Sequence, residues 1–412
     1  MFRLRRKKCV AFFHPNCLDC GGGEKVLWVS VKALQRENCK ICIYSEDANY
    51  EKAKNIVESR FSLPVPESIE FINVGEASFI RPGRFPRFTL ILQALSSMLY
   101  AFKCLIRLVP SVVIDTTGAP FAAPIWKIFG GCKVISYIHY PFISTDMLSA
   151  VNSGEESFNN DQSIAKSRIL TTIKILYYRT LAQFYSLVGK FNDVVMCNSS
   201  WTGNHIQKIF KRVPILAFPP CDTTEFSKLS LFDKRVRKQI VSIQQFRPEK
   251  NLPLQVRIIE KLSERVPGVK LIIAGGCRND GDRRILNSLQ EEINQKKLPI
   301  TLEPNVSFER LKQLLETSDL GLHTMYNEHF GICVVEFMAS GLIPIANKSA
   351  GPHLDIVQDE DHLALSLDEY VDKIEKAFDD LDERRRMFRD KSFRFSYDEY
   401  ETTFIKSIEQ YI

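Results

Sequence analysis

The chain has 412 residues, of which 45% are hydrophobic and 25% are charged, a balance typical of a folded protein with more than one domain. The formal net charge of +6 is small for this length and no single block carries it, which argues against a nucleic-acid-binding protein. The eleven cysteines are spread along the chain among hydrophobic neighbours, so we expect reduced thiols and a cytosolic environment.

The first half of the chain alternates short apolar runs with amphipathic stretches. The runs predict strands, because they are rich in β-branched and aromatic residues, at positions 10–13, 40–44, 111–115, 133–138 and 194–197. Residues 24–35 have the apolar spacing of a helix. The adjacent prolines Pro219 and Pro220 then interrupt any regular element.

The second half restarts the same alternation. It predicts a helix at 253–264 and strands at 239–243, 270–274, 301–303, 320–323 and 343–346. Strands that alternate with helices form parallel sheets covered on both faces. We therefore predict an α/β protein with two Rossmann-like domains facing across a cleft, residues 1–218 and 219–395, and a final helix at 396–412 that packs back on the first domain. Ligands of such sheets bind where strands end.

The segment 81–109 differs from an ordinary soluble helix. It begins with Arg81, Arg84 and Arg87 and continues as a long apolar stretch. Its polar residues recur at helical spacing and form one stripe, made of Gln93, Ser96, Ser97, Tyr100, Lys103 and Arg107. Such a helix either lies in a membrane interface or packs on the sheet with its polar stripe outward. The same two interpretations apply to a second helix at 169–191.

Residues 17–29, CLDCGGGEKVLWV, allow a metal site as one interpretation. Cys17 and Cys20 form a CxxC pair, and Cys39 and Cys42 form another at a spacing that zinc sites use. The second pair brackets the start of a strand, whose successive side chains point to opposite faces. Four thiolates would not converge easily there, which disfavours zinc.

The same residues also fit a loop that approaches an anion. A strand precedes them, a helix follows them, and the glycines carry no Cβ. The backbone N–H groups of Gly22 and Gly23 could therefore face a phosphate at the positive end of the helix. A purely structural turn is nearly as compatible.

Two cations follow the strand at 239–243. Arg247 and Lys250 in SIQQFRPEKN stand three residues apart, ahead of a helix, where they could neutralise a diphosphate without a metal. The alternative is a pair of solvated surface charges. His139 follows the strand at 133–138 and could donate to a sugar hydroxyl or carry a proton, although a buried structural histidine is the commoner case.

Two carboxylates follow the strand at 320–323, in YNEHFGICVVEFMASG. Glu328 lies in a loop, and Glu336 lies one turn inside a helix that opens at Gly331. The free N–H groups of Gly331, Ile332 and Cys333 could meet a phosphate or a sugar oxygen. The carboxylates could bind hydroxyls at two parts of one elongated ligand.

These motifs resemble glycosyltransferase family 4, which has the GT-B fold and contains retaining, metal-independent enzymes. Glu328 and Glu336 match its E-x7-E pair, and Arg247 and Lys250 match its diphosphate-binding pair. A narrower resemblance, to the α-1,2-mannosyltransferases of the dolichol pathway, is carried by FFHPNCLDCGGGEKVLW, YIHYPFISTDML, CNSSWTGNHI, QFRPEKN and HTMYNEHFGICVVEFMASG.

The resemblance implies a role for each of these residues in the second half. Arg247 and Lys250 would hold the diphosphate of GDP-mannose, which is a substrate and not a cofactor. Glu336 would bind the ribose and Glu328 the mannose hydroxyls. The amides at 331–333 would assist at the phosphate or sugar.

In the first half, His139 would face the transferred mannose. Gly22 and Gly23 would approach the donor phosphate or the acceptor hydroxyl. The first domain would thus serve the acceptor and the second the donor.

The resemblance also implies partners and a location. The acceptor would be the dolichol-diphosphate-linked oligosaccharide on the cytosolic face of the endoplasmic reticulum membrane, where N-glycan precursors are assembled. Other dolichol-pathway mannosyltransferases could join in a complex. Two alternatives remain: a related enzyme with another donor, such as UDP-N-acetylglucosamine, and a non-catalytic scaffold.

The chain departs from the family pattern in three respects, one of which is that the segment after Asp355 lacks the usual Gly-Phe. We expect no membrane span ahead of the first strand, so attachment would depend on the segment 81–109 and on the basic residues 3–8, which anionic headgroups attract. Gln244 stands where relatives usually have a small residue beside the diphosphate.

Overall fold

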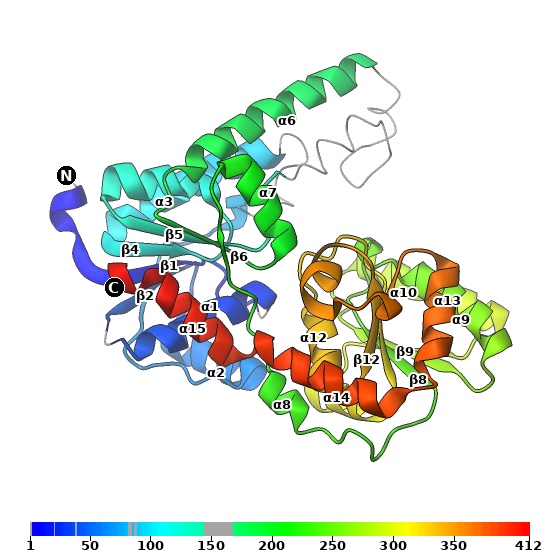
Figure 1. The fold of residues 1–412 in the computed structure, drawn as a ribbon. Helices are drawn as coiled ribbons and strands as arrows, with labels where there is room; N and C mark the ends of the chain where they lie inside the picture. Colours follow the sequence, from blue (N-terminus) through cyan, green and yellow to red (C-terminus); the bar gives the residue numbers. More distant parts are fainter. Residues whose placement is uncertain (1, 20, 38, 81–84, 86–88, 144–167) are drawn as a thin grey trace. The chain divides into compact units, whose positions relative to one another are not determined.

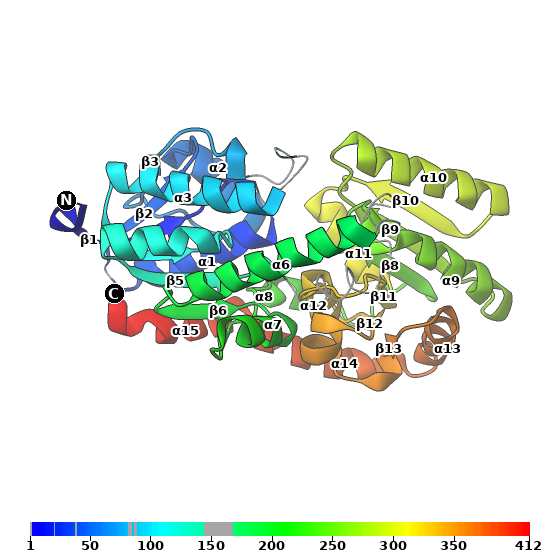
Figure 2. The ribbon, with the colours of Figure 1, turned by 90° about the horizontal axis from the view of Figure 1, so that it is seen from above.

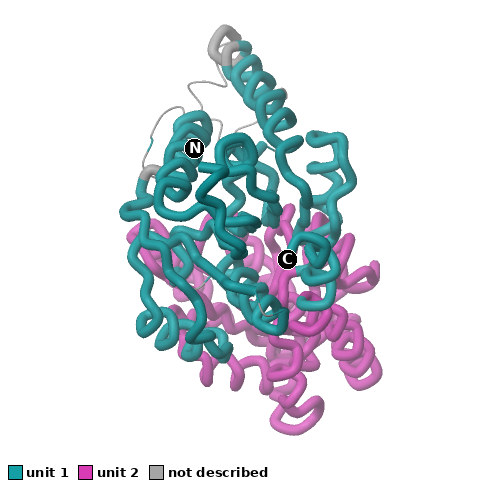
Figure 3. Tube along the Cα trace, turned by 90° about the vertical axis from the view of Figure 1, so that its left-hand side faces the viewer, with its two compact units in different colours: residues 1–218, 401–412 teal, residues 219–400 magenta. Residues whose placement is uncertain are grey.

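The computed structural model describes residues 2–19, 21–37, 39–80, 85, 89–143 and 168–412. Contacts within the chain divide it into two units, residues 1–218 with 401–412 and residues 219–400 (Figure 3). Sequence analysis placed the last boundary at 395/396, whereas the contacts place it at 400/401.

Unit 1 is built on a seven-stranded sheet in which every pair of neighbouring strands is parallel. The strand order is β3-β2-β1-β4-β5-β6-β7 (Figure 1). The bounds are β1 (Lys7–Phe13), β2 (Ile41–Ser45), β3 (Glu70–Asn73), β4 (Pro110–Asp115), β5 (Lys133–Ile138), β6 (Val194–Cys197) and β7 (Ile215–Leu216). The predicted strands are confirmed, and β3 and β7 are additions that the sequence did not reveal.

Helices cover both faces of this sheet. α3 (Thr89–Arg107) and α6 (Arg168–Gly189) lie on one face, and α1 (Gly22–Gln35), α2 (Tyr50–Phe61) and α15 (Tyr397–Ile408) on the other (Figure 1). α7 (Ser200–Phe210) packs against α6. Glu401 of α15 is buried and pairs with Lys32 of α1 at 2.7 Å and with Arg36, the residue that caps the C-terminus of α1, at 2.9 Å. These contacts hold the C-terminal helix on unit 1.

The orientation of α3 corrects one expectation. Ser97 and Tyr100 of the polar stripe are buried, and the Tyr100 hydroxyl donates to the Gly75 carbonyl oxygen at 3.1 Å. The exposed face instead carries large apolar side chains, namely Ile91, Leu95, Leu99 and Ile106. The stripe therefore does not point outward as a whole, because its central polar groups find hydrogen-bond acceptors inside the unit.

α3 and α6 lie side by side in unit 1 (Figure 2). The Ile91 N–H donates to the Tyr177 hydroxyl at 3.2 Å, and Ala94 of α3 shares an apolar cluster with Leu181 and Tyr185 of α6. Among the described residues, α3 is the one helix whose length and composition would allow a membrane span. Arg81, Arg84 and Arg87 lie outside those residues.

Unit 2 repeats the design with six parallel strands in the order β10-β9-β8-β11-β12-β13. The bounds are β8 (Gln239–Ile243), β9 (Lys270–Gly275), β10 (Ile300–Pro304), β11 (Leu320–His323), β12 (Ile343–Asn347) and β13 (Leu363–Ala364). The helices are α8 (Thr223–Ser227), α9 (Leu252–Arg265), α10 (Asp280–Lys296), α11 (Phe308–Thr317), α12 (Ile332–Ala339), α13 (Leu367–Ala377) and α14 (Leu381–Ser392).

A buried ion pair joins α14 to the sheet of unit 2. Arg385 donates from Nη2 to Asp319 Oδ1 at 2.5 Å, and both side chains are almost fully buried. The other Asp319 oxygen accepts the Lys238 N–H at 2.7 Å, and Arg385 Nη1 donates to the Gly341 carbonyl at 2.9 Å. The pair is thus fully hydrogen-bonded at the start of β11.

Both sheets have the strand order of a doubly wound α/β fold, which confirms the predicted fold class. The direction of winding reverses between β1 and β4 in unit 1 and between β8 and β11 in unit 2. Ligands of such sheets bind beyond the strand ends at this reversal point. Each unit should therefore present its functional residues after those four strands.

Candidate active site in two polar clusters

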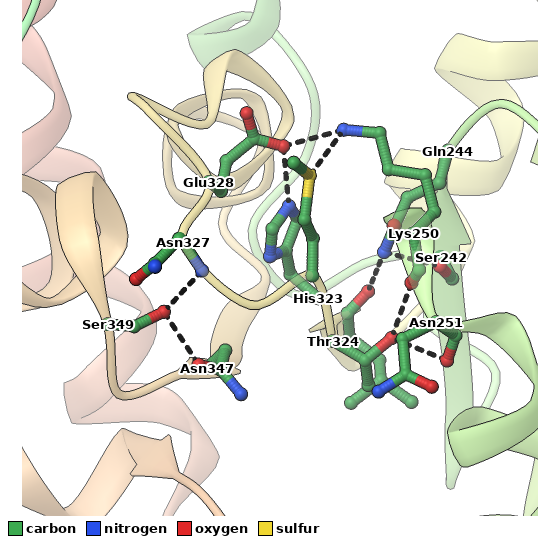
Figure 4. Close-up of polar contacts among 12 residues, drawn as sticks. Ser242, Gln244, Lys250, Asn251, His323, Thr324, Asn327, Glu328, Asn347 and Ser349 are labelled. Atoms are coloured by element: carbon green, nitrogen blue, oxygen red, sulfur yellow. Dashed lines mark hydrogen bonds and ion pairs between the residues drawn. The ribbon is translucent and has the colours of Figure 1, made fainter. Parts of the chain in front are cut away.

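In unit 2, the predicted residues Lys250 and Glu328 meet (Figure 4). Lys250 ends a 3-10 turn (Pro248–Lys250) after β8, and Glu328 follows β11, the neighbouring strand. Lys250 Nζ lies 2.6 Å from Glu328 Oε2, and both side chains are more than four-fifths buried. Nζ also lies 3.1 Å from the Met325 sulfur. A cation and a carboxylate from separate motifs therefore form one site.

His323, the last residue of β11, joins this pair and was not among the predicted site residues. Its Nε2 lies 3.3 Å from the same Glu328 Oε2 that pairs with Lys250. Burial opposes ionisation of Glu328, but the hydrogen bond from His323 and the charge of Lys250 outweigh it and hold the pKa of Glu328 well below its usual range. Glu328 is therefore an acceptor of hydrogen bonds, not an acid.

Side-chain hydrogen bonds hold the two loops of this cluster in place. The Thr324 hydroxyl lies 3.0 Å from the Lys250 carbonyl oxygen and accepts a bond from Gln255 Nε2 at 3.0 Å. Ser349 Oγ accepts the Asn327 N–H at 2.8 Å, which supports Asn327 in a left-handed conformation (φ 54°). Glu328 thus follows a turn that the hydrogen bond from Asn327 to Ser349 stabilises.

Four further predicted donor-site residues follow Glu328 in the sequence. Gly331 precedes α12 with φ 107°, a conformation that favours glycine. Ile332 and Cys333 form the first turn of α12, and burial raises the pKa of the Cys333 thiol to about 12. Glu336 lies half-buried in α12. The helix starts where the sequence predicted it.

Arg247 and Gln244 lie in the loop after β8. Among the residues that the structure describes, no side chain pairs with the half-buried Arg247 guanidinium, so that charge is available to a ligand. Gln244 is buried and its amide nitrogen lies 3.2 Å from Ser242 Oγ. The Gln244 side chain is therefore turned into unit 2.

Unit 1 holds a second cluster, centred on His14, which follows β1. The buried His14 ring bonds through Nδ1 to Thr116 Oγ1 at 2.7 Å and through Nε2 to Glu24 Oε1 at 3.1 Å. Glu24 Oε2 accepts the Gly21 N–H at 2.6 Å. Burial opposes ionisation of Glu24, but the hydrogen bond from His14 outweighs it and lowers the pKa of Glu24. The glycine loop is thereby tied to β4.

The same cluster includes the predicted His139 and the glycine loop. His139 Nε2 donates to the Thr116 carbonyl oxygen at 3.0 Å. A Cβ added to Gly23 would lie 3.5 Å from His139 Nε2 and 3.9 Å from the His14 ring, so the loop lies against both histidines. Gly22 begins α1, where backbone N–H groups lack partners within the helix.

The zinc interpretation gains no support. Cys17 is buried, and burial raises the pKa of its thiol to about 12. Cys42 lies within β2 and Cys39 ahead of it, while Cys20 lies outside the described residues. No group of three or more His, Cys, Asp and Glu side chains in the described part of the chain could hold a metal ion.

Sequence reasoning missed His14, Glu24, Thr116 and His323. A usable signal existed for the histidines, since His14 follows a strand as His139 does and His323 ends one. Glu24 and Thr116 gave no separate signal, because their roles depend on β1 and β4 being neighbours. The two clusters belong to different units, and the contacts described for each cluster are made by residues of its own unit.

Two family models match the chain. Residues 7–210 match the model described as ALG11 mannosyltransferase N-terminus, and residues 224–393 match the model described as glycosyl transferases group 1. The first match contains the His14 cluster, and the second contains Lys250 and Glu328. The family models thus cover both clusters.

Relatives match the chain over nearly its whole length. Proteins named GDP-Man:Man(3)GlcNAc(2)-PP-Dol alpha-1,2-mannosyltransferase from Xenopus laevis and from Homo sapiens are each 39% identical to it. The alignments cover 98% of this chain in both cases, 88% of the frog protein and 87% of the human one.

Solved structures support the fold. Anabaena Alr3699/HepE, in complex with UDP and glucose, is 15% identical with a TM-score of 0.65, covering 98% of this chain and 100% of that one. The trehalose 6-phosphate synthase of Burkholderia multivorans is 14% identical with a TM-score of 0.68, covering 98% of each chain. The chain is therefore a GT-B glycosyltransferase, and it belongs to the family of GDP-Man:Man(3)GlcNAc(2)-PP-Dol alpha-1,2-mannosyltransferases.

Proposed function

We propose that this protein transfers mannose from GDP-mannose to a dolichol-diphosphate-linked oligosaccharide, forming an α-1,2 linkage with retention of configuration. The observation that carries the proposal is the Lys250–Glu328 pair at the winding reversal of unit 2, which supplies a cation and a hydroxyl acceptor in one place. The near full-length similarity to relatives that carry this activity in their names supports the same substrates.

In this proposal, Lys250 and Arg247 bind the donor diphosphate. Arg247 has its guanidinium available, and Lys250 exchanges the Glu328 carboxylate for phosphate oxygens. Glu328, once released, accepts hydrogen bonds from mannose hydroxyls. Glu336, inside α12, accepts from the ribose, and the amides of the first turn of α12 face the phosphate or the sugar.

The reaction proceeds by attack of the acceptor hydroxyl on the same face that the leaving group departs from. The bond from the acceptor oxygen to the anomeric carbon forms as the bond from that carbon to the β-phosphate oxygen breaks. The hydroxyl proton passes to the leaving phosphate, whose charge Arg247 and Lys250 stabilise. We propose that no metal takes part, because these two side chains supply the positive charge that a metal would otherwise provide.

The unit 1 cluster serves the transferred sugar and the acceptor. His139 faces the mannose, and Gly22 and Gly23 let the backbone approach a phosphate or the attacking hydroxyl. The contacts among His14, Thr116 and Glu24 support this role, because they hold the loop against the His139 ring. The loop would then keep its shape without a bound ligand.

We further propose that the enzyme works at the cytosolic face of the endoplasmic reticulum membrane and that α3 and α6 contact the lipid. Large apolar side chains are exposed on both helices, Leu95 and Leu99 on α3 and Leu176, Phe184 and Leu187 on α6. Helices that lie side by side and expose apolar side chains fit an interfacial position better than a soluble surface.

The double variant Leu95→Gln/Leu99→Gln tests this surface. Both leucines are more than half exposed, so the change should leave folding intact and lower the partition onto anionic lipid vesicles by at least about tenfold, since each leucine loses its apolar contact. Vesicle co-sedimentation measures the partition. Val213→Gln, on an exposed residue outside both helices, is the control and should bind as wild type. Unchanged binding of the double variant would place the lipid contact elsewhere.

The activity itself is tested by transfer of labelled mannose from GDP-mannose to a short synthetic lipid-linked mannosyl acceptor in the presence of EDTA. We expect a product that an α-1,2-mannosidase removes, which would establish donor, linkage and metal independence together. GDP binding without transfer would point to another acceptor or to a scaffold. Competition by UDP but not by GDP would overturn the proposed donor.

A further inference from the structure

Stability of unit 2 does not explain why position 323 carries a histidine. It is fully buried at the end of β11, and its Nδ1 has no hydrogen-bond partner within the described part of the chain. Its backbone carbonyl accepts the Tyr370 hydroxyl at 3.3 Å, a contact that any residue could make. A buried polar atom without a partner destabilises the folded state, so an apolar residue would serve the core better.

The other ring nitrogen shows what the side chain does. Nε2 lies 3.3 Å from Glu328 Oε2, and because a carboxylate only accepts, Nε2 carries the hydrogen. Lys250 Nζ lies 2.6 Å from the same oxygen (Figure 4). His323 and Lys250 are therefore two donors on one carboxylate oxygen.

Donor binding separates these two contacts. In the proposed complex the Lys250 ammonium turns toward the diphosphate, and the phosphate oxygens compete for its N–H groups and weaken its 2.6 Å contact with Glu328. The Lys250 cation thus holds Glu328 less firmly at the stage when the Glu328 carboxylate must stay oriented toward the donor sugar. His323 is buried and is the last residue of the fully buried strand β11, so its bond to Glu328 can persist throughout.

We propose that His323 is the positioning residue of Glu328: it holds the carboxylate toward the donor sugar after Lys250 has moved to the diphosphate. The inference rests on the proposed roles of Glu328 and Lys250. It predicts that removal of the histidine harms recognition of the sugar but not of the nucleotide diphosphate.

His323→Leu is the main test. We expect an unfolding temperature equal to or above that of the wild type, because the unpaired nitrogen is gone and the volume is similar. Affinity for GDP should stay within about twofold, while kcat/KM for GDP-mannose should fall by about 10- to 100-fold, the range for losing one hydrogen bond to a charged group. His323→Gln, whose amide N–H can replace Nε2–H, should recover part of that loss.

Two comparisons separate positioning from a structural effect. His362 is also fully buried in unit 2, beside Asp359 and Arg384, so His362→Leu is a matched control that should change stability but not kcat/KM. In a Glu328→Ala background, which removes the acceptor oxygen, His323→Leu should change kcat/KM by less than about twofold, because the two residues act through one contact.

The outcomes are distinct. Folded His323→Leu enzyme with wild-type kcat/KM would overturn the proposal, as would a loss of GDP affinity equal to the loss of kcat/KM. If His323→Leu does not fold, the cycle of His323→Gln with Glu328→Ala decides: a partial loss of kcat/KM that disappears in the Glu328→Ala background supports the proposal, and a loss that persists there overturns it. Failure of the proposed function has another signature, since the wild type itself would then not transfer mannose from GDP-mannose.

Discussion

Lys250→Ala should lower kcat for mannose transfer by about 10²- to 10³-fold, the usual cost of removing one group that stabilises transition-state charge. GDP affinity should fall much less, because Lys250 already pairs with Glu328 at 2.6 Å in the free protein. Binding GDP thus exchanges one anion for another. The breaking bond adds charge to the leaving phosphate, and only there does the ammonium gain a stronger interaction.

Single-turnover rates and GDP titrations of the same samples measure the two effects separately. Lys296→Ala is the matched control, since Lys296 pairs with Glu260 at 2.8 Å on the surface of the same unit. That variant should match the wild type in both measurements, because exposed ion pairs contribute little. Equal losses of kcat and GDP affinity in Lys250→Ala would argue that Lys250 serves binding alone.

Asp319→Ala should lower the free energy of unfolding of unit 2 by about 3–5 kcal/mol, the cost of breaking a buried ion pair from one side. Arg385 would keep its charge in a site from which water is excluded, and the Lys238 N–H would lose its acceptor. Arg235 lies in the same charged group, where burial and the nearby Arg385 lower the pKa of its guanidinium to about 9. Asp319 offsets the charge of both cations, and Glu316 also acts on Arg235.

Chemical denaturation followed by a probe in unit 2 measures this loss. Asp368→Ala is the control, because Asp368 pairs with Lys261 at 2.5 Å on the surface and should cost less than about 1 kcal/mol. A similar small loss in Asp319→Ala would mean that Arg385 finds water or another acceptor when Asp319 is removed.

Local sequence patterns predicted most elements of both sheets. β5, β6, β8 and β11 match the predicted residues at both ends, because each is a buried apolar run flanked by polar residues. β3, β7 and β13 escaped prediction for a physical reason. β7 and β13 are two residues long, and β3 is only partly buried, so none leaves an apolar run that differs from a loop.

The sequence predicts those parts of the candidate site whose backbone structure depends only on neighbouring residues in the chain. Gly331 and α12, and the turn that carries Lys250, are local structures that follow from glycine, proline and helix spacing. The orientation of α3 was not predictable in this way. Its spacing revealed the polar stripe, but whether Ser97 and Tyr100 face water or the interior depends on acceptors such as the Gly75 carbonyl, which is distant in sequence.

The sequence by itself determined that the chain is a two-domain α/β protein and that its candidate site residues follow strands. The tertiary structure alone decided which strand ends meet. β1 lies beside β4, so His14 reaches Thr116, and β8 lies beside β11, so Lys250 reaches Glu328 and His323. Hydrophobic periodicity records which face of a strand is buried but not which strand is its neighbour, because pairing depends on the packing of the whole sheet.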